Sequence, residues 1–419
     1  MSFRIEGKKI RDAEGPDVQA AWAIEDEARR KGERIEMAET NAHPIATDDV
    51  RAEIADGIGW ITLNRPKQLN ALNLPMIRAI RTALEAFEAD EAVRLVVFEG
   101  AGERGFCAGG DIRALYAARE EPDRATARTF FAEEYAVDHY VLTYAKPVVA
   151  FLDGIVMGGG VGLSYGATVK IVTERTRWAM PEAGIGFFPD VGASYFLSRL
   201  PHHAGRYLAL TGEAVGADVL LRLGLADCFL PSAAWPAVKA ALREAGAAGA
   251  DAPAILTALR ERCRRSPGEA GAGPVGGAPA EGAGSGSQDV DGLFERTARY
   301  FAGESVPAIV DALEAGAEAG DAWARETLAV LRGRSPTSLL VIFETLRRGR
   351  TSTYKEALVR DLGVADAFLA HGDFYEGIRA QVVDKDRRPR WRPASLAEVT
   401  PEAVAAFFRD PPRPIPFVR

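Results

Sequence analysis

The chain has 419 residues, of which 47% are hydrophobic, and it carries a formal net charge of −8 at pH 7. This length and composition are typical of a soluble globular protein that buries a sizeable core in two or three units. The acidic balance argues against nucleic acid and anionic membranes as partners, because both bind through a positive field. No run approaches the roughly 18 apolar residues that a membrane-spanning helix needs, so no membrane is expected.

The cysteines and histidines give no sign of a metal site or of a disulfide framework. The chain has 3 cysteines and 5 histidines, and none of them shows the spacing of metal ligands. The odd number of cysteines and the lack of an apolar signal region near the N-terminus indicate a reducing compartment. We therefore expect a cytoplasmic protein without a metal.

The predicted elements begin after a charged N-terminal extension. Residues 1–45 alternate charges, which predicts a poorly ordered segment with some helix. Over residues 46–240 strand and helix patterns alternate, which predicts an α/β core. The expected elements, in chain order, are a hairpin with its turn at Asp56–Gly57 and its second strand at 58–63, a helix capped by Asn73, a strand at 95–98, a helix over 126–144, a strand at 147–152, a short helix, and a strand at 169–172.

The composition changes after this core. Residues 264–290 are rich in glycine, alanine and proline and offer almost nothing large to bury, which predicts a disordered insertion. Over residues 291–419 the apolar residues return at helical spacing, which predicts a mostly helical C-terminal region. Its proline-rich stretches predict an extended tail, because proline cannot continue a helix.

Two acidic residues are the first candidates for chemistry. Glu182 and Asp190 lie in a run of large apolar side chains that includes Phe187 and Phe188. Burial among such residues raises the pKa of a carboxyl towards the range that general acid or base catalysis uses. A polar loop on the surface is the ordinary alternative, since structural carboxylates outnumber catalytic ones.

Two glycine-rich turns lie upstream of these acids, at 106–111 and 157–163, and each follows a predicted strand. Glycine allows the main chain to approach a ligand closely, so paired N–H groups from two such turns can form an oxyanion hole. Tight packing would explain a single turn. Two similar turns before an apolar acid pair favour a site.

Two other motifs are weaker. Gly162–Gly166 matches the G-x-S-x-G pattern of a serine nucleophile, with His371 downstream. That pattern needs its serine at a sharp turn directly after a strand, whereas Ser164 falls inside the following predicted helix, so we expect no serine nucleophile. Glu133 and Glu134 lie on the long helix and point in different directions, so at most one of them faces a site.

Four motifs, taken in their order and spacing, resemble the crotonase (enoyl-CoA hydratase/isomerase) superfamily over roughly residues 50–235. They are residues 64–72, 106–112, 158–160 and 180–182. The resemblance implies a spiral ββα fold, an acyl-CoA as the small-molecule partner with no further cofactor, and an oxyanion hole formed by the N–H groups of Gly110 and Gly159. Members usually assemble as trimers or hexamers and some are monomers, so a homo-oligomer is left open.

Within that superfamily the chain resembles the 3-hydroxyisobutyryl-CoA hydrolase branch. Hydratases carry a first glutamate where this chain has Gly162, whereas Glu182 matches their second glutamate. The run 187–192 with Asp190, and the C-terminal runs 335–339 and 373–386, are similar to the hydrolase branch. The resemblance implies hydrolysis of 3-hydroxyisobutyryl-CoA in valine breakdown, with Glu182 as nucleophile or general base and Asp190 orienting the substrate hydroxyl or the water.

The resemblance also implies contacts to the substrate. Glu134 matches a substrate-contacting glutamate of the hydrolase branch, and Gly109 and Asp111 flank the expected oxyanion hole. Arg65 and Lys67 are expected near the CoA phosphates or adenine. Two alternatives remain, namely an enoyl-CoA isomerase or hydratase of the same superfamily and a non-catalytic acyl-CoA-binding protein.

Overall fold

The computed structural model separates the chain into two units, Met1–Ile45 and Ala46–Arg419. The structure describes residues 3–5, 8–10, 47–264, 289–411 and 413–418. In the first unit, strands β1 (Phe3–Ile5) and β2 (Lys8–Ile10) pair in antiparallel orientation. The predictions of a poorly ordered N-terminal extension and of a disordered insertion otherwise concern residues outside those described.

A large sheet is the frame of the second unit. Among the described residues it has six strands in the order β11-β9-β7-β5-β4-β3, and all neighbours are parallel except the hairpin pair β3 and β4. The hairpin turns at Asp56 and Gly57, both with positive φ, as the sequence predicts. The strands are β3 (Val50–Ala55), β4 (Ile58–Leu63), β5 (Leu95–Gly100), β7 (Val148–Leu152), β9 (Val169–Val172) and β11 (Cys228–Phe229).

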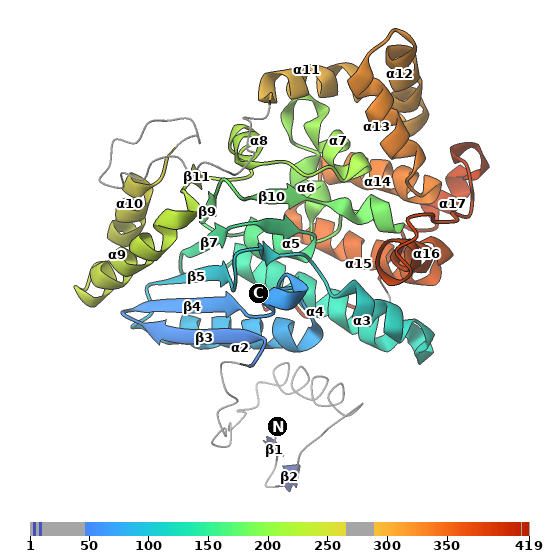
Figure 1. The fold of residues 1–419 in the computed structure, drawn as a ribbon. Helices are drawn as coiled ribbons and strands as arrows, with labels where there is room; N and C mark the ends of the chain where they lie inside the picture. Colours follow the sequence, from blue (N-terminus) through green and yellow to red (C-terminus); the bar gives the residue numbers. More distant parts are fainter. Residues whose placement is uncertain (1–2, 6–7, 11–46, 265–288, 412, 419) are drawn as a thin grey trace. The chain divides into compact units, whose positions relative to one another are not determined.

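A smaller parallel sheet gives the fold its spiral. In the described part of the chain it consists of β6 (Gly105–Cys107), β8 (Ile155–Met157) and β10 (Arg177–Ala179), in the order β10-β8-β6. Each of these strands follows one strand of the large sheet, and helices come after β6 and β8. The chain therefore winds through a repeated ββα unit (Figure 1). The predicted α/β class is confirmed.

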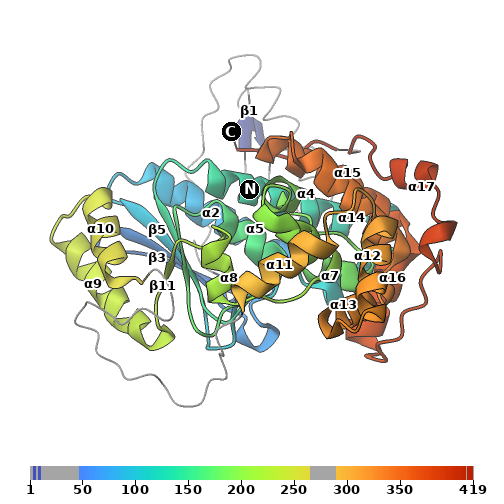
Figure 2. The ribbon, with the colours of Figure 1, turned by 90° about the horizontal axis from the view of Figure 1, so that it is seen from above.

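Helices cover both faces of the large sheet. On one face, Trp60, Val97 and Phe151 pack against α9 (Trp235–Ala247) and α10 (Ala252–Arg262), with the ring of Trp235 stacked on Phe151. On the other face, α2 (Leu74–Ala89) and α4 (Ala125–Leu142) belong to the main hydrophobic core. Figure 2 shows α9 and α10 at one side of the sheet, away from the C-terminal helices α14 (Pro336–Gly349), α15 (Tyr354–Ala370) and α16 (Gly372–Ile378).

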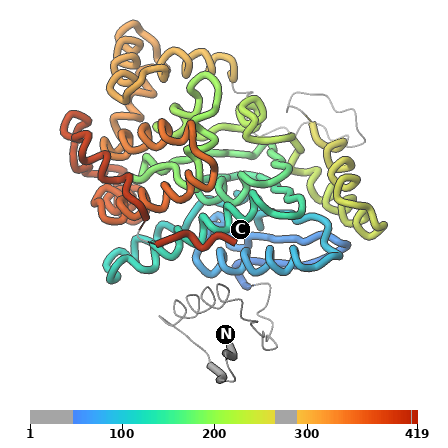
Figure 3. The backbone as a smooth tube through the Cα atoms, turned by 180° about the vertical axis from the view of Figure 1, so that it is seen from behind, coloured from blue at the N-terminus to red at the C-terminus, as the bar shows by residue number. Residues whose placement is uncertain are grey.

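The C-terminal region is helical, as predicted. Helix α14 packs on α6 and α7, and α15 packs on α4. Figure 3 shows the orange and red C-terminal segments against the green middle of the chain. The remaining helices are α3 (Ile112–Ala117), α5 (Gly159–Tyr165), α6 (Ala193–Leu197), α7 (Ala204–Thr211), α8 (Ala217–Arg222), α11 (Val290–Tyr300), α12 (Val306–Glu318), α13 (Ala322–Arg332), α14 (Pro336–Gly349), α15 (Tyr354–Ala370), α16 (Gly372–Ile378) and α17 (Pro401–Ala405).

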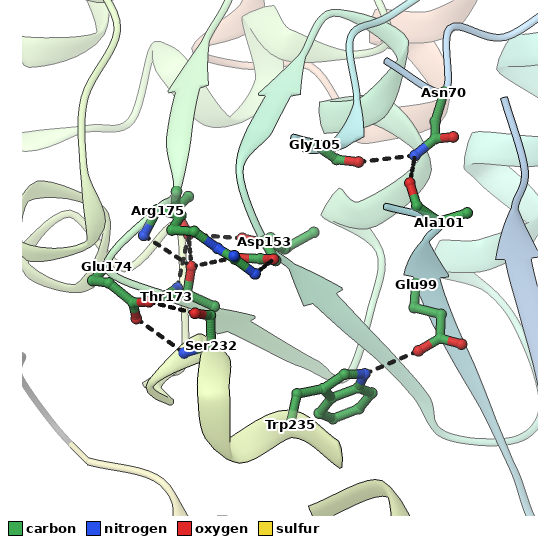
Figure 4. A network of polar contacts seen from close by, with 12 residues as sticks. Asn70, Glu99, Ala101, Gly105, Asp153, Thr173, Glu174, Arg175, Ser232 and Trp235 are labelled. Carbon is green, nitrogen blue, oxygen red and sulfur yellow. Dashed lines mark hydrogen bonds and ion pairs between the residues drawn. The ribbon is translucent and has the colours of Figure 1, made fainter. Parts of the chain in front are cut away.

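Polar side chains fix the connections between the strands (Figure 4). The buried amide of Asn70 donates hydrogen bonds to the carbonyl oxygens of Ala101 and Gly105, at 3.1 and 2.8 Å, and so holds the crossover from β5 to β6. Arg175 donates to Asp153 at the ends of β7 and β9. The crossover held by Asn70 leads directly into the first glycine turn, so this network sets the position of that turn.

Candidate active site

The first glycine turn is held by the loop that precedes α2. Leu72 donates its N–H to the carbonyl of Gly109 at 2.8 Å, and its own carbonyl accepts from the N–H of Asp111 at 2.7 Å. Gly109 has a φ of +94°, a conformation that favours glycine. No hydrogen bond among the described residues uses the N–H of Gly110, which is therefore free to donate to a ligand.

Arg65 stabilises this turn from outside the cavity. Its guanidinium donates to the carbonyl of Ala71 at 2.7 Å and to Oδ2 of Asp111 at 3.1 Å. Arg65 is not among the residues that line the cavity, whereas Lys67 is. The sequence analysis expects both basic residues near the CoA phosphates. In the structure only Lys67 lines the cavity, whereas Arg65 bonds to the glycine turn.

The second glycine turn lies directly against the first. A Cβ atom added to Gly109 would lie 3.4 Å from the backbone nitrogen of Gly159. Gly158 has a φ of +50°, and Gly159 begins α5, so its N–H has no partner within the helix. The free N–H groups of Gly110 and Gly159 therefore border one cavity, an arrangement that can bind a carbonyl oxygen as it gains charge.

Two glutamates touch the second turn. Glu182 lies in the 3₁₀ turn Pro181–Ile185, and a Cβ at Gly158 would lie 3.0 Å from its Oε1. Glu134 comes from α4, and a Cβ at Gly159 would overlap its Oε1. The adjacent Glu133 points elsewhere and forms an ion pair with Arg78 at 2.7 Å. Only one glutamate of this pair faces the cavity, as helical geometry predicts.

Asp190 completes the acidic group. Its Oδ2 accepts a hydrogen bond of 2.6 Å from the hydroxyl of Tyr135 on α4. Glu134, Glu182 and Asp190 are 2%, 7% and 5% exposed, yet all three line the cavity. The sequence predicts two acids, Glu182 and Asp190, in an apolar setting. In the structure Glu134 joins them, so three buried carboxyls lie at the cavity.

The pKa values of these three carboxyls are raised because the groups are buried and have no cation beside them in the described parts of the chain. Burial, and then the neighbouring acids, raise the pKa of Glu134 and of Glu182 well above the usual range. Burial raises the pKa of Asp190 to about 6, while the Tyr135 hydroxyl lowers it. None of the three forms an ion pair with a cation in the described parts of the chain. Close carboxyls in a dry site cannot all ionise, so Asp190 is the one that ionises most easily.

These groups border a cavity of about 710 Å³, a size typical of small-molecule and cofactor sites. Its apolar wall contains Phe130, Phe131, Phe187 and Phe374. The predicted site residues that line it are Lys67, Gly109, Gly110, Asp111, Glu134, Gly159, Glu182 and Asp190. A cavity with an apolar wall, free N–H donors and buried acids is equipped to bind and cleave an ester-like bond.

The structure also brings in residues that sequence reasoning missed. Arg104, Arg113 and Arg334 line the cavity, and no motif marks them. Asp138 lies one turn after Glu134 on α4 and is fully buried. A Cβ at Gly162 would lie 2.6 Å from its Oδ2. The spacing of four residues from Glu134 was the signal that could have identified Asp138.

The serine motif has no catalytic geometry. Ser164 is buried inside α5, where its hydroxyl donates to the carbonyl of Gly160 at 2.8 Å. His371 instead caps the first turn of α16 by accepting from the N–H of Asp373. The expectation that Ser164 is no nucleophile agrees with this placement.

A ββα spiral with paired glycine turns and buried acids at one cavity is the arrangement of a crotonase-type protein. The chain belongs to the enoyl-CoA hydratase/isomerase family, whose model, Enoyl-CoA hydratase/isomerase, matches residues 58–408. The superfamily resemblance and the fold class expected from the sequence are thereby confirmed.

Relatives over nearly the whole length agree with this assignment. The chain is 36% identical over 382 residues to the mitochondrial 3-hydroxyisobutyryl-CoA hydrolase of Gallus gallus, covering 90% of this chain and 92% of that protein. It is also 36% identical over 377 residues to the Homo sapiens protein of the same name, covering 88% and 90%.

Solved structures agree as well. A carnitinyl-CoA dehydratase from Mycobacterium thermoresistibile matches with a TM-score of 0.77 and 36% identity, covering 89% of this chain and 99% of that one. An enoyl-CoA hydratase from Rhodobacter sphaeroides 2.4.1 matches with a TM-score of 0.73 and 36% identity, covering 86% and 97%. The similar proteins thus carry the names of different reactions, so the reaction of this chain rests on its site.

Proposed function

We propose that this protein hydrolyses a short branched 3-hydroxyacyl-CoA thioester, 3-hydroxyisobutyryl-CoA, to 3-hydroxyisobutyrate and CoA. The observation that carries the proposal is the presence of Asp190, a second buried acid, in the cavity that holds Glu182. The relatives from Gallus gallus and Homo sapiens, which are named as hydrolases of this substrate, support the same choice.

The chemistry is divided between the glycine turns and the acids. The N–H groups of Gly110 and Gly159 would hold the thioester oxygen as it becomes negative, and each such donor is worth about 3 kcal/mol of transition-state stabilisation. If Glu182 attacks the carbonyl carbon, the C–S bond breaks to leave a mixed anhydride, which water then hydrolyses to release the hydroxy acid, and the departing thiolate takes a proton from water. If Glu182 instead deprotonates the attacking water, the C–S bond breaks and the proton held by Glu182 passes to the departing thiolate. Asp190 would orient the water or the substrate hydroxyl.

The rest of the cavity would bind the substrate. Glu134 lies against the oxyanion turn, so its carboxyl oxygen would accept a hydrogen bond from the 3-hydroxyl of the acyl group. Lys67, Arg104 and Arg113 line the cavity, and their cations would face the phosphates of CoA, which would allow an acidic protein to bind an anionic ligand. Arg65 would act indirectly, by holding Asp111. No cofactor besides the CoA of the substrate is proposed.

The same geometry weighs against a hydratase that uses two glutamates. Residue 162 is glycine, and a Cβ there would lie 2.6 Å from Oδ2 of Asp138 and 2.6 Å from Cβ of Val191. A glutamate side chain has no room at this position. An isomerase would need only Glu182 and would leave Asp190 without a role, and a non-catalytic acyl-CoA-binding protein would need neither acid.

The proposal is tested by measuring thiol release from 3-hydroxyisobutyryl-CoA, 3-hydroxypropionyl-CoA and crotonyl-CoA, with hydration of crotonyl-CoA followed in parallel. We expect thiol release from the 3-hydroxyacyl substrates alone, and a loss of at least about 100-fold in Glu182→Ala and Asp190→Asn. Glu133→Gln is the matched control, because Glu133 pairs with Arg78 outside the cavity. Hydration or isomerisation without thiol release would refute the hydrolase.

The cellular compartment and the oligomeric state are separate from the reaction. No helix in the described ranges is long and apolar enough to cross a bilayer. The relatives from Gallus gallus and Homo sapiens are named as mitochondrial. The cytoplasmic location expected from the sequence therefore stays a prediction, and so does a homo-oligomer.

A further inference from the structure

The turn that follows Asp190 has an unusual backbone. Val191 and Gly192 have φ angles of 50° and 74°, and the N–H of Ala193 donates to the carbonyl of Asp190 at 2.8 Å. Two central residues with positive φ define a turn that favours asparagine and glycine. Valine is a poor choice here, because a β-branched residue is crowded by its own backbone in the left-handed region. Surrounding contacts therefore have to hold the turn.

Those contacts come from α15, more than 150 residues further along the chain. The hydroxyl of Tyr354 donates to the carbonyl of Val191 at 3.0 Å, and Oδ2 of Asp361 accepts from the N–H of Gly192 at 2.8 Å. Both side chains are buried. A Cβ at Gly192 would overlap the ring of Tyr354, so the ring also closes the space beside the turn.

Helix α15 is itself well fixed. A capping box between Thr353 and Glu356 secures its first turn, directly beside Tyr354. The ring of Tyr354 stacks on that of Tyr165 from α5, with centroids 5.3 Å apart. Tyr354 and Asp361 lie two turns apart on the same face of the helix. Tyr354 and Asp361 thus bind the C=O and the N–H of the same peptide unit, the one that joins Val191 to Gly192 in the strained turn.

We propose that Tyr354 and Asp361 are positioning residues, which hold the Val191–Gly192 turn in its left-handed conformation and so place the carboxyl of Asp190 in the cavity. The inference rests on the hydrolysis proposed above, in which Asp190 orients the water or the substrate hydroxyl. Without the two bonds the turn relaxes towards ordinary valine geometry, and the carboxyl of Asp190 moves with it. A shift of about 1 Å at a catalytic group costs up to about 100-fold in rate.

The test deletes each bond and then removes the strain. In Tyr354→Phe and Asp361→Ala we expect kcat for thiol release to fall about tenfold or more, with KM changed less than about threefold. Asp361→Asn keeps an acceptor for the Gly192 N–H and should restore most of the rate. In a Val191→Gly background glycine adopts the positive φ without crowding. Tyr354→Phe should therefore lower kcat clearly less in that background than it does in the protein with Val191. Val191→Asn serves as a second background if the glycine variant folds poorly.

Two controls separate positioning from general stability. Tyr300→Phe deletes a hydroxyl that donates to Asp321 at 2.7 Å, in α11 outside the cavity, and should leave kcat unchanged. Folding of each variant is checked by its Tm. Rates of Tyr354→Phe and Asp361→Ala within about twofold of wild type, or equal costs of Tyr354→Phe beside Val191 and beside glycine, would overturn the inference. A wild-type protein that releases no thiol would refute the hydrolase instead.

Discussion

At the residue scale, the chemistry depends on which buried carboxyl gives up its proton first. Glu134, Glu182 and Asp190 share one cavity, and the Tyr135 hydroxyl donates only to Asp190. This bond favours the ionised form of Asp190, whereas burial and the neighbouring acids raise the pKa of both glutamates well above the usual range, so Glu182 has to lose its proton at a higher pH before it can attack or act as a base. Similar buried groups therefore differ in pKa because a single hydroxyl donates to one of them.

This difference predicts a pH profile. On the proposal both Asp190 and Glu182 act as anions, and the pKa of Glu182 is raised as well, so kcat/KM for thiol release should fall as the pH drops, at a pH no lower than about 6, the pKa of Asp190. Tyr135→Phe removes the group that lowers this pKa, so the acid limb should move to higher pH. Glu134, Asp138, Glu182 and Asp361 also face this region, so the limb belongs to a coupled set. An acid limb at the same pH in both proteins would contradict the assignment.

At the element scale, the site depends on how closely α4 and α5 approach. Glu134 lies against Gly159, and Asp138 lies against Gly162, so two acids one turn apart on α4 face two glycines one turn apart on α5. Any side chain on those glycines would meet a carboxyl. Both glycines therefore serve the packing of the two helices, and Gly159 would also serve the proposed oxyanion hole.

This packing predicts the effect of Gly159→Ala. Its Cβ would overlap Oε1 of Glu134 and would stand at the oxyanion turn, so thiol release should fall by about 100-fold or more. Gly372→Ala is the matched control, because nothing lies within 4 Å of a Cβ there. Activity is measured with 3-hydroxyisobutyryl-CoA, and folding by circular dichroism. An active Gly159→Ala enzyme would show that this turn does not bind the thioester oxygen.

The elements themselves could largely be predicted from the sequence. The expected strands at 58–63 and 169–172 match β4 and β9 to the residue, and the expected helix at 126–144 is α4 at 125–142. Local periodicity and capping determine such elements, as the bond from Met76 to Asn73 illustrates. The glycine turns and Glu182 could also be predicted, because each lies in a short motif.

The contacts that complete the site could not be predicted. Tyr354 reaches Val191 across 163 positions and Asp361 reaches Gly192 across 169, and no local pattern in one sequence reports such distances. Arg65 shows the opposite error, since it lies near Lys67 in sequence but does not line the cavity and bonds instead to Asp111, which does. Sequence order gives the neighbours along the chain, whereas tertiary packing decides which of them face the ligand.

At the scale of the whole molecule, the buried acids affect stability. Burial raises the pKa of Asp361 to about 8 and that of Asp190 to about 6, both above the values of an exposed aspartate. A group whose pKa is higher in the folded state stabilises the fold below its unfolded pKa. That contribution is lost as the pH rises through the folded pKa. Ionisation of Asp361 and Asp190 therefore lowers the free energy of unfolding as the pH rises.

The sign of this effect can be measured. We expect the free energy of unfolding to decrease as the pH rises from about 4 to about 8, with the Asp361 contribution lost last. Asp361→Asn cannot ionise, so its stability should depend less on pH, and its advantage over wild type should grow towards pH 8. Urea unfolding at several pH values tests this. A stability difference that stays constant with pH would contradict a raised pKa at Asp361.

The bond between Gly192 and Asp361 also has a consequence for biosynthesis. A growing chain carries both glycine turns and Glu182 well before it carries α15. Any chain that ends before residue 354 therefore lacks both groups that hold the turn after Asp190. On the proposal made here, a nascent chain carries the two oxyanion glycines and Glu182 before it carries the groups that place the second acid, and before α16 supplies Phe374 to the wall of the cavity. Competence for hydrolysis is then a property of the finished chain, not of the sheets that carry the glycine turns.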